Sequence, residues 1–313
     1  MKRALFLIFC TVAVALPQVG AAALIYKPKR LDRAKASLVV VVHGCLQSPE
    51  SMALGTGWNE IADANNLVVL YPQVPAGSNP LGCWSWYLPE HQRADSGQLK
   101  TLRDEIAAVK REQQILRAPV FLAGMSSGGA TVAGLIACFP KEFAGGAIHS
   151  APSYALAATL PEAEKILKEG PPTARPEAPC KPRDFRGSLI VLHGAGDVGV
   201  HPLHAQQVVS DFIGLTKAGE EKQLIAGELC YALTDFAAAH GGKGRLLMIE
   251  GLPHAWSGYG TNLRYSAFVG PTGKFPTQLP FFSATGPSAT NLIWEFFQEI
   301  PRPAKSAKAK RKP

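Results

Sequence analysis

Short, uninterrupted apolar runs rich in β-branched residues limit the fold of this chain more than any other feature. They span residues 38–42 and 67–70, and a further run lies within residues 188–194. A strand with one solvated face alternates apolar and polar residues, whereas a strand that is covered on both faces does not. The runs therefore predict the α/β class, with a mostly parallel central sheet and helices on both faces.

A G-x-S-x-G motif follows another apolar run. The sequence GMSSG occupies residues 124–128, directly after the apolar residues 120–123 and before a segment of small residues that could form a helix. This order is typical of a serine on a tight turn between a strand and a helix. Glycine is needed on both sides because a β-carbon there would collide with neighbouring main chain. Ser126 is therefore the predicted nucleophile.

An acid and a base follow later strands, in the order expected for a Ser-Asp-His triad. Asp197 lies after the run in residues 188–194, and His254 follows the last predicted strand, residues 245–250. In such a triad the histidine takes the serine proton, and the aspartate orients the imidazole and stabilises its cation. This pattern predicts acyl transfer. The alternatives are His201 and His204 for the base, and Asp184, Asp211 and Asp235 for the acid.

Helical periodicity appears in three places. Apolar residues recur every three or four positions within 97–113, residues 58–65 look helical, and Ser288 could cap a helix near the C-terminus. By contrast, six prolines lie within residues 155–187. This segment is predicted to be a surface excursion able to cover part of the substrate cleft.

The two ends of the chain differ from the rest. Residues 1–23 contain two basic residues, an apolar stretch too short to span a bilayer comfortably, and small residues resembling a cleavage site. We expect a signal peptide, and hence a secreted or periplasmic protein with no integral membrane segment after cleavage. Residues 24–301 are predicted to form the catalytic domain, and the basic residues 302–313 a disordered tail.

The formal net charge of +8 is concentrated at the two ends. Two of the excess basic residues lie in the predicted signal peptide and six in the tail, so the predicted domain is nearly neutral. A nucleic-acid partner is therefore not expected. Contact of the tail with an anionic surface or nucleic acid is the alternative.

Cysteines are expected to form two disulfides. Five remain after the predicted signal peptide is removed: Cys45, Cys83, Cys138, Cys180 and Cys230. Cys138 lies on an apolar helical face, where a cysteine behaves as a small hydrophobic residue, and is expected to be unpaired. The other four allow three pairings. No spacing of cysteine and histidine resembles a zinc site, and no metal or cofactor is expected.

Aromatic residues gather near the predicted site. Trp84 and Trp86 lie in one loop, and Trp256 follows the candidate base. They could line a substrate cleft, or they could pack the loops onto the domain.

Several motifs together resemble one family. The chain is similar to the secreted esterases that include polyhydroxybutyrate (PHB) depolymerases and related feruloyl and acetylxylan esterases, which are α/β-hydrolases. The matching motifs are HGC at 43–45, GTGWN at 55–59, CWSW at 83–86, the glycine-serine turn at 124–129, HG at 193–194 with Asp197, and HAWSG at 254–258. The similarity covers nearly all of the chain after the predicted signal peptide.

The resemblance implies specific roles at the site. It implies the triad named above, an oxyanion hole formed by the backbone N–H groups of Cys45 and Ser127, and a disulfide between Cys45 and Cys83. With that pairing, Cys230 is the expected partner of Cys180.

The expected function is that of a serine carboxylesterase acting on short-chain hydroxyalkanoate esters. The alternative substrates are feruloyl or acetylxylan esters, and a non-catalytic binding protein with the same fold is a further alternative. Because no substrate-binding module follows residue 301, soluble oligomers or small esters are expected in preference to solid polyester.

Overall fold

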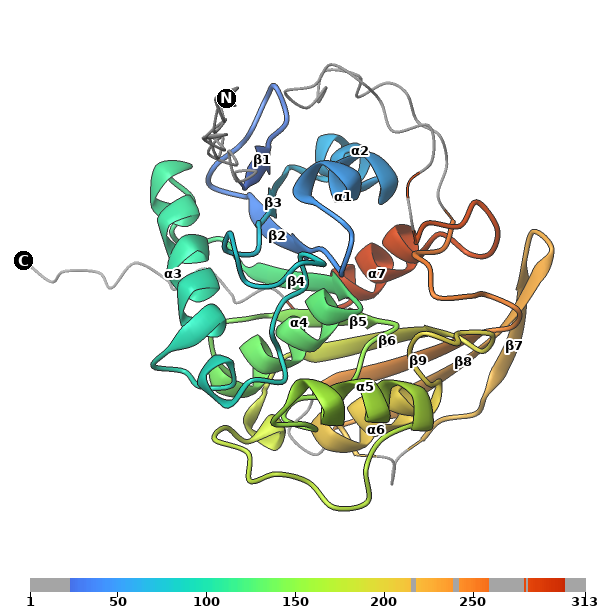
Figure 1. Cartoon of the computed structure of the whole chain (residues 1–313). Helices are drawn as coiled ribbons and strands as arrows, with labels where there is room; N and C mark the ends of the chain where they lie inside the picture. The colour runs from blue at the N-terminus through green and yellow to red at the C-terminus, as the bar shows by residue number, and fades with distance from the viewer. Residues whose placement is uncertain (1–22, 215–217, 239–241, 259–278, 280, 302–313) are drawn as a thin grey trace, which may run out of the picture.

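A computed structural model describes residues 23–214, 218–238, 242–258, 279 and 281–301. The predicted tail, and the predicted signal peptide apart from Ala23, lie outside these residues. The described strands form one sheet in the order β1-β3-β2-β4-β5-β6-β9-β8-β7 (Figure 1). The strands are β1 (Leu24–Tyr26), β2 (Ser37–Val42), β3 (Leu67–Tyr71), β4 (Val120–Met125), β5 (Gly145–His149), β6 (Ser188–Gly194), β7 (Lys222–Ala226), β8 (Leu229–Ala237) and β9 (Lys243–Ile249).

The centre of the sheet is parallel. Strands β3, β2, β4, β5, β6 and β9 run in the same direction, whereas β1 at one edge and β8 and β7 at the other are antiparallel to their neighbours. Every residue of β2, β3, β4, β5 and β6 is buried. The prediction from the apolar runs is therefore confirmed for the central strands. Sequence reasoning missed β1, β7 and β8. Strand β7 contains no buried residue, and β8 combines buried residues with partly and fully exposed ones.

Helices cover both faces of this sheet. Helices α3, α4 and α6 pack on one face, and α1, α2 and α7 pack on the other. The helices are α1 (Pro49–Gly55), α2 (Trp58–Asn65), α3 (Gly97–Glu112), α4 (Ser127–Cys138), α5 (Leu160–Glu169), α6 (Leu203–Phe212) and α7 (Ala289–Gln298), with 3₁₀ turns η1 (Pro89–His91) and η2 (Pro182–Asp184). The predicted class, α/β with helices on both faces, is confirmed.

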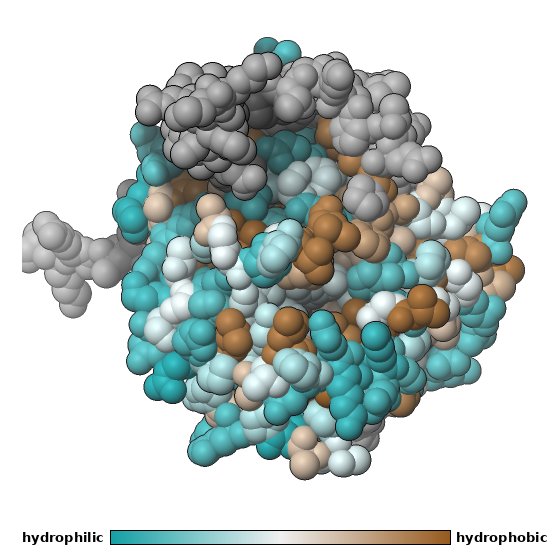
Figure 2. Space-filling view, viewed as in Figure 1, coloured by the Kyte–Doolittle hydropathy of each residue, from teal (hydrophilic) through white to brown (hydrophobic). Residues whose placement is uncertain are grey.

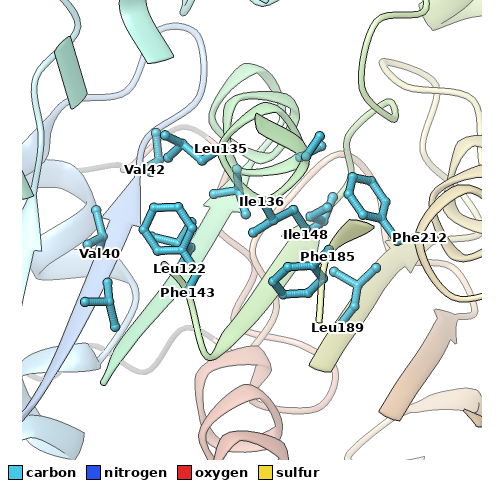
Figure 3. Packing of buried hydrophobic residues seen from close by; sticks show 14 of the residues in the cluster. Val40, Val42, Leu122, Leu135, Ile136, Phe143, Ile148, Phe185, Leu189 and Phe212 are labelled. Atoms are coloured by element: carbon cyan, nitrogen blue, oxygen red, sulfur yellow. The ribbon is translucent and has the colours of Figure 1, made fainter. Parts of the chain in front are cut away.

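Alternate residues of each central strand enter different cores. On β2, Val40 and Val42 belong to the core that contains Leu135 and Ile136 of α4, as Figure 3 shows. Val39 and Val41 belong to the core on the opposite face, against α2 and α7. Successive side chains of a strand point to opposite faces. An uninterrupted run of valines can therefore fill two cores at once.

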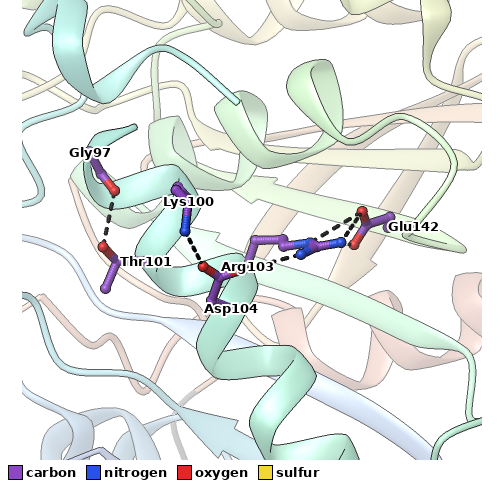
Figure 4. Close-up of polar contacts among 6 residues, drawn as sticks. All are labelled: Gly97, Lys100, Thr101, Arg103, Asp104 and Glu142. Carbon is purple, nitrogen blue, oxygen red and sulfur yellow. Dashed lines mark hydrogen bonds and ion pairs between the residues drawn. The ribbon is translucent and has the colours of Figure 1, made fainter. Parts of the chain in front are cut away.

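Helix α3 matches the helix predicted over 97–113. Its buried side packs on the sheet, and its outer side carries charges (Figure 4). Lys100 pairs with Asp104 at 2.5 Å, and Arg103 donates hydrogen bonds to both carboxylate oxygens of Glu142 at 3.0 to 3.2 Å. Exposed ion pairs of this kind contribute little because water and salt screen them, so the apolar side of α3 provides most of its stabilisation.

The proline-rich segment contains a helix that its composition did not predict. Helix α5 begins after Thr159, whose hydroxyl accepts the N–H of Glu162 at 3.4 Å, and Pro161 lies in its first turn. Proline is tolerated there because the first N–H groups of a helix have no partner within the helix. Sequence reasoning predicted a surface excursion over residues 155–187 but did not predict α5 within it.

The visible surface mixes polar and apolar residues. Figure 2 shows hydrophobic residues in small separate groups among hydrophilic ones on this face. Within the described residues, no helix combines the length and apolar character needed to cross a bilayer.

Candidate active site

Ser126 occupies a sharp turn between β4 and α4. Its backbone has φ 55° and ψ −125°, in a region that a non-glycine residue seldom adopts. Two hydrogen bonds hold this conformation: the N–H of Ser126 donates to His149 O at 3.0 Å, and its carbonyl accepts from Ala130 N at 3.0 Å. The side chain is partly exposed. Strained backbone of this kind persists only where the surroundings enforce it.

The glycines of the motif allow close main-chain approach. A β-carbon at Gly124 would lie 2.5 Å from Gly128 O, and one at Gly128 would lie 2.3 Å from Val42 O. Both distances are too short for a real contact. At the end of β2, a β-carbon on Gly44 would lie 3.1 Å from Ser126 Cβ. The turn that follows β2 therefore lies directly against the candidate nucleophile.

A hydrogen bond connects His254 with Asp197. His254 Nδ1 lies 2.8 Å from Asp197 Oδ2, and because a carboxylate can only accept, Nδ1 carries the hydrogen. Asp197 Oδ1 accepts two backbone N–H groups, from Gly199 at 2.9 Å and Val200 at 2.8 Å. The Asp197 side chain is fully buried, whereas that of His254 is 16% exposed. This arrangement leaves Nε2 of the imidazole as the nitrogen able to exchange a proton with a neighbour.

The environment of Asp197 favours its ionised form. Burial by itself would raise the pKa of this carboxyl. The hydrogen bond and charge of His254, together with the N–H of Val200, outweigh burial and lower the pKa of Asp197 below its ordinary value. The buried group thus stays negatively charged, and its charge can stabilise an imidazolium at His254.

Ser126, Asp197 and His254 follow three parallel strands at one edge of the sheet. The strand register aligns Met125 with His149, and His193 with Met248. Strands β4, β6 and β9 therefore end together, and the loops after them carry the three candidate residues. His149 is close to both Ser126 and His254. Its carbonyl accepts the Ser126 N–H, and the charge of His254 contributes to lowering the pKa of its ring.

The residues implied for the oxyanion hole flank Ser126. Ser127 is the first residue of α4, and N–H groups in the first turn of a helix have no acceptor within that helix. Cys45 lies in the turn after β2 and forms a disulfide with Cys83, the pairing that the family resemblance implied. Leu46 N donates to Leu81 O at 2.8 Å. The turn is thus fixed by a covalent bond and a hydrogen bond.

The second disulfide corrects a prediction. Cys180 pairs with Cys138 and not with Cys230, which is free. Cys138 is the last residue of α4 and is only partly buried, and the turn η2, which follows Cys180, packs against α4. Cys230 lies in β8, towards the far edge of the sheet. An apolar sequence around Cys138 suggested a buried thiol, but its place at the end of the helix makes it accessible to Cys180.

Two of the three candidate cleft tryptophans belong to the core instead. Trp84 is 2% exposed and Trp256 is 1% exposed, so neither presents a side chain to a substrate in this structure. The Trp256 ring stacks on His149, with centroids 5.3 Å apart, and its Nε1 donates to Thr290 Oγ1 at 3.1 Å. Trp86 remains partly exposed. The sequence placed these residues near the site but could not distinguish packing from an open cleft.

Two buried histidines lie beside the site. Sequence reasoning named His193 within a matching motif and assigned no catalytic role to it or to His149. His193 Nε2 donates to Val200 O at 2.9 Å and lies 3.5 Å from Asp197 Oδ2. His149 is fully buried, and burial together with the charges of His193 and His254 lowers its pKa to about 3. Their positions at the ends of predicted strands were the available signal. Both rings support the site as neutral groups.

The rival residues lie elsewhere. His204 is buried and bonds to Ile166 O at 2.8 Å, Asp211 pairs with Arg175, and Asp235 pairs with Arg245. Asp184 belongs to η2, and His201 Nδ1 accepts the N–H of Leu203. Among the described residues, no group of three or more His, Cys, Asp or Glu side chains is arranged to hold a metal ion.

A mostly parallel sheet with a serine turn after β4 and a bonded histidine and aspartate after β9 and β6 defines an α/β-hydrolase. Solved structures share this fold. Acetyl xylan esterase from Aspergillus awamori superposes with a TM-score of 0.61 at 15% identity, covering 74% of this chain and 88% of that one. The chain belongs to the family described as esterase PHB depolymerase, whose model matches residues 21–222.

Curated relatives resemble part of the chain. Poly(3-hydroxyalkanoate) depolymerase C of Paucimonas lemoignei is 25% identical over 186 residues, which is 57% of this chain. Feruloyl esterase B of Thermothelomyces thermophilus is 29% identical over 140 residues, which is 43% of this chain. In each case the match covers 45% of the relative, so the chain spans less than half of the length of these proteins.

Proposed function

We propose that this protein is a secreted or periplasmic serine carboxylesterase that hydrolyses short-chain hydroxyalkanoate esters through an acyl-enzyme. The observation that carries the proposal is the hydrogen bond between His254 and Asp197, at the edge of the sheet where Ser126 follows β4. Membership of the esterase family and the name of the depolymerase relative support the choice of substrate.

In the first step Ser126 Oγ attacks the ester carbonyl carbon, and His254 Nε2 accepts the hydroxyl proton. The charge that develops on the carbonyl oxygen is stabilised by the N–H groups of Cys45 and Ser127. The bond to the alcohol oxygen then breaks, and the imidazolium returns its proton to the leaving alkoxide. Asp197 stays ionised throughout and stabilises the imidazolium.

Water completes the cycle. It attacks the acyl-enzyme carbonyl while His254 Nε2 takes one of its protons, and collapse of the second tetrahedral intermediate returns that proton to Ser126 Oγ. The carboxylic acid leaves and the free enzyme is restored. Trp86, the one candidate cleft tryptophan that keeps exposed surface, contributes to the wall of the substrate cleft.

The second candidate function is feruloyl or acetylxylan ester hydrolysis by the same residues. The names of two groups of relatives favour it: feruloyl esterase B, and the acetylxylan esterases of Aspergillus species, which are 22% identical over 206 to 208 residues. The chemistry at Ser126 would be the same, and only the groups on either side of the ester would differ.

Location and domain limits are part of the proposal. Residues 1–23 act as a signal peptide, residues 24–301 form the catalytic domain and residues 302–313 form a tail. The two disulfides support an oxidising compartment, because disulfides persist mainly outside the cytosol.

The test is hydrolysis by residues 24–313 of soluble 3-hydroxybutyrate oligomers, methyl ferulate, acetylated xylan and p-nitrophenyl acetate. Ser126→Ala should lower kcat about 10⁶-fold, because the nucleophile is lost. Ser210→Ala, which removes a hydroxyl from α6 away from the site, is the control and should keep full activity. Activity on ferulate or xylan alone would favour the second function, and hydrolysis that survives in Ser126→Ala would overturn the assignment of the nucleophile.

A further inference from the structure

Phe281 contacts the candidate base directly, although it lies far from the family motifs in sequence. Its ring meets the imidazole of His254 edge to face, with centroids 5.7 Å apart and planes at 73°. The family match ends at residue 222, so this contact lies outside the matched region. Phe281 is partly exposed, as is His254. An apolar ring therefore lies beside the imidazole, where the surface remains open.

The main chain fixes Phe281 in this position. Trp256 N donates to Phe281 O at 2.8 Å, and Ser283 N donates to Trp256 O at 2.9 Å. Trp256 and Phe282 form a parallel bridge, which joins the segment before α7 to the loop after β9 (Figure 1). Because Trp256 is only two residues from His254, these bonds couple the position of Phe281 to that of the base.

Two further features indicate that the position is defined and not incidental. Phe281 has φ 63°, a conformation in which a bulky residue is strained. The next side chain, Phe282, packs so closely on α1 that a β-carbon at Gly55 would lie 2.5 Å from its ring. The segment is thus anchored on one side by Phe282, while the ring of Phe281 is directed to His254.

Two other positions on the imidazole also have neighbours. Asp197 bonds to Nδ1, and a β-carbon at Gly199 would lie 3.2 Å from His254 Cγ. In the proposed mechanism Nε2 donates its proton to the oxygen of the leaving alcohol, which requires that oxygen within about 3 Å of Nε2. The first carbons of the alcohol must then lie beside the groups that border the imidazole. In the described part of the chain, Phe281 is an apolar side chain seen in contact with the imidazole.

We infer that Phe281 is a specificity-determining residue that contacts the alcohol portion of the ester and favours an aliphatic one. This inference rests on the proposed function and deepens it, because it assigns one side of the ester to one side chain. A ring at this place would favour longer aliphatic alcohols over methanol. It would have little effect on the length of the acyl chain, which lies on the other side of the reacting carbon.

The experiment compares two isomeric esters with methyl acetate as the reference. Butyl acetate lengthens the alcohol, and methyl pentanoate lengthens the acyl chain by the same three carbons. In Phe281→Ala, kcat/KM for butyl acetate relative to methyl acetate should fall about tenfold, because apolar contact with the alcohol is lost. The ratio for methyl pentanoate should stay within about twofold of the unchanged protein. A purely structural role would lower all three values by one factor.

Control variants make the result decisive. Phe282→Leu changes the neighbouring ring, which faces Gly55, and should leave both ratios unchanged. Phe281→Leu is the second variant, for the case in which Phe281→Ala folds poorly. It keeps an apolar group and should retain part of the preference for butyl acetate over methyl acetate. Unchanged ratios in both Phe281 variants, or an equal fall in both ratios, would overturn the inference. If the unchanged protein hydrolyses 3-hydroxybutyrate oligomers but none of the three esters, the inference is overturned and the proposed function stands. If it hydrolyses neither, the proposed function fails. Ser126→Ala identifies any background hydrolysis.

Discussion

The replacement Asp197→Asn tests the candidate triad most directly, because the structure determines how the new amide must lie. In the aspartate, Oδ1 accepts two backbone N–H groups at 2.8 and 2.9 Å, and Oδ2 accepts the His254 Nδ1–H at 2.8 Å. Asparagine offers one oxygen and one NH₂ group in place of the two oxygens. The NH₂ group must therefore face either the two backbone N–H groups or His254, and only the second orientation avoids opposing two donors.

The two orientations differ strongly in energy. If the NH₂ group faced the loop, it would oppose the N–H groups of Gly199 and Val200. Each of these donors would lose its acceptor, at a cost of about 1–3 kcal/mol in stability. The amide oxygen will therefore face the loop, and the NH₂ group will face His254. A donor at that position requires Nδ1 to be the acceptor, so the hydrogen of the neutral imidazole moves to Nε2. His254 then has no free lone pair to accept the Ser126 proton.

The expected effect is large in rate and small in stability. Loss of the correct tautomer should lower kcat about 10⁴-fold, equivalent to about 5 kcal/mol in the barrier. The free energy of unfolding should fall by about 1–3 kcal/mol, because the two backbone hydrogen bonds survive but lose a charged acceptor. The assays are hydrolysis of p-nitrophenyl acetate at pH 7 and unfolding in urea.

Asp211→Asn is the matched control. This carboxylate is also mostly buried, with a side chain 10% exposed, but it pairs with Arg175 instead of the base. Its replacement should leave kcat unchanged. If Asp197→Asn retained more than about a tenth of the activity while remaining folded, the assignment of Asp197 as the residue that orients His254 would be refuted.

Two further predictions concern stability. Cys138→Ala should lower the free energy of unfolding by on the order of 4 kcal/mol, because it opens a disulfide with a sequence separation of 42, whereas Cys230→Ala should have little effect. Thermal unfolding without reductant measures both, and equal losses would contradict the observed pairing. His204 is buried and its pKa is lowered by burial to about 4, so acid protonates it more readily in the unfolded chain. Between about pH 6.5 and 4, protonation of His204 in the unfolded chain should lower the free energy of unfolding by about 1.4 kcal/mol for each pH unit that the pH falls. His204→Gln should reduce the slope of unfolding free energy against pH by that amount in urea titrations, and an identical slope would disprove this role.

Local sequence determined the central strands and the turn at Ser126. The valine run of β2 and the apolar run of β6 predicted strands buried on both faces, because a strand has a fixed alternation and these runs contain no polar side to expose. The glycines around Ser126 likewise predicted a turn with close main-chain contacts. Such features depend on backbone geometry over a few residues, so a sequence can specify them.

The candidate residues Asp197 and His254 could be chosen for a related reason. Both follow predicted parallel strands, and the carboxyl ends of parallel strands lie at one edge of the sheet. The sequence predicted that they would be neighbours. It did not predict the two N–H groups that hold Asp197 or the two buried histidines nearby, because those contacts depend on how the loops fold back.

Tertiary structure alone decided the disulfide partner of Cys180, the burial of Trp84 and Trp256, and the contact between Phe281 and His254. Each depends on the approach of segments that lie far apart in the chain. The pattern around Cys138 is apolar whether or not the helix end is accessible, and a tryptophan in a loop can pack inward or face a ligand. The sequence by itself therefore determined the strands and the reactive turn, and the packing of distant segments determined what surrounds them.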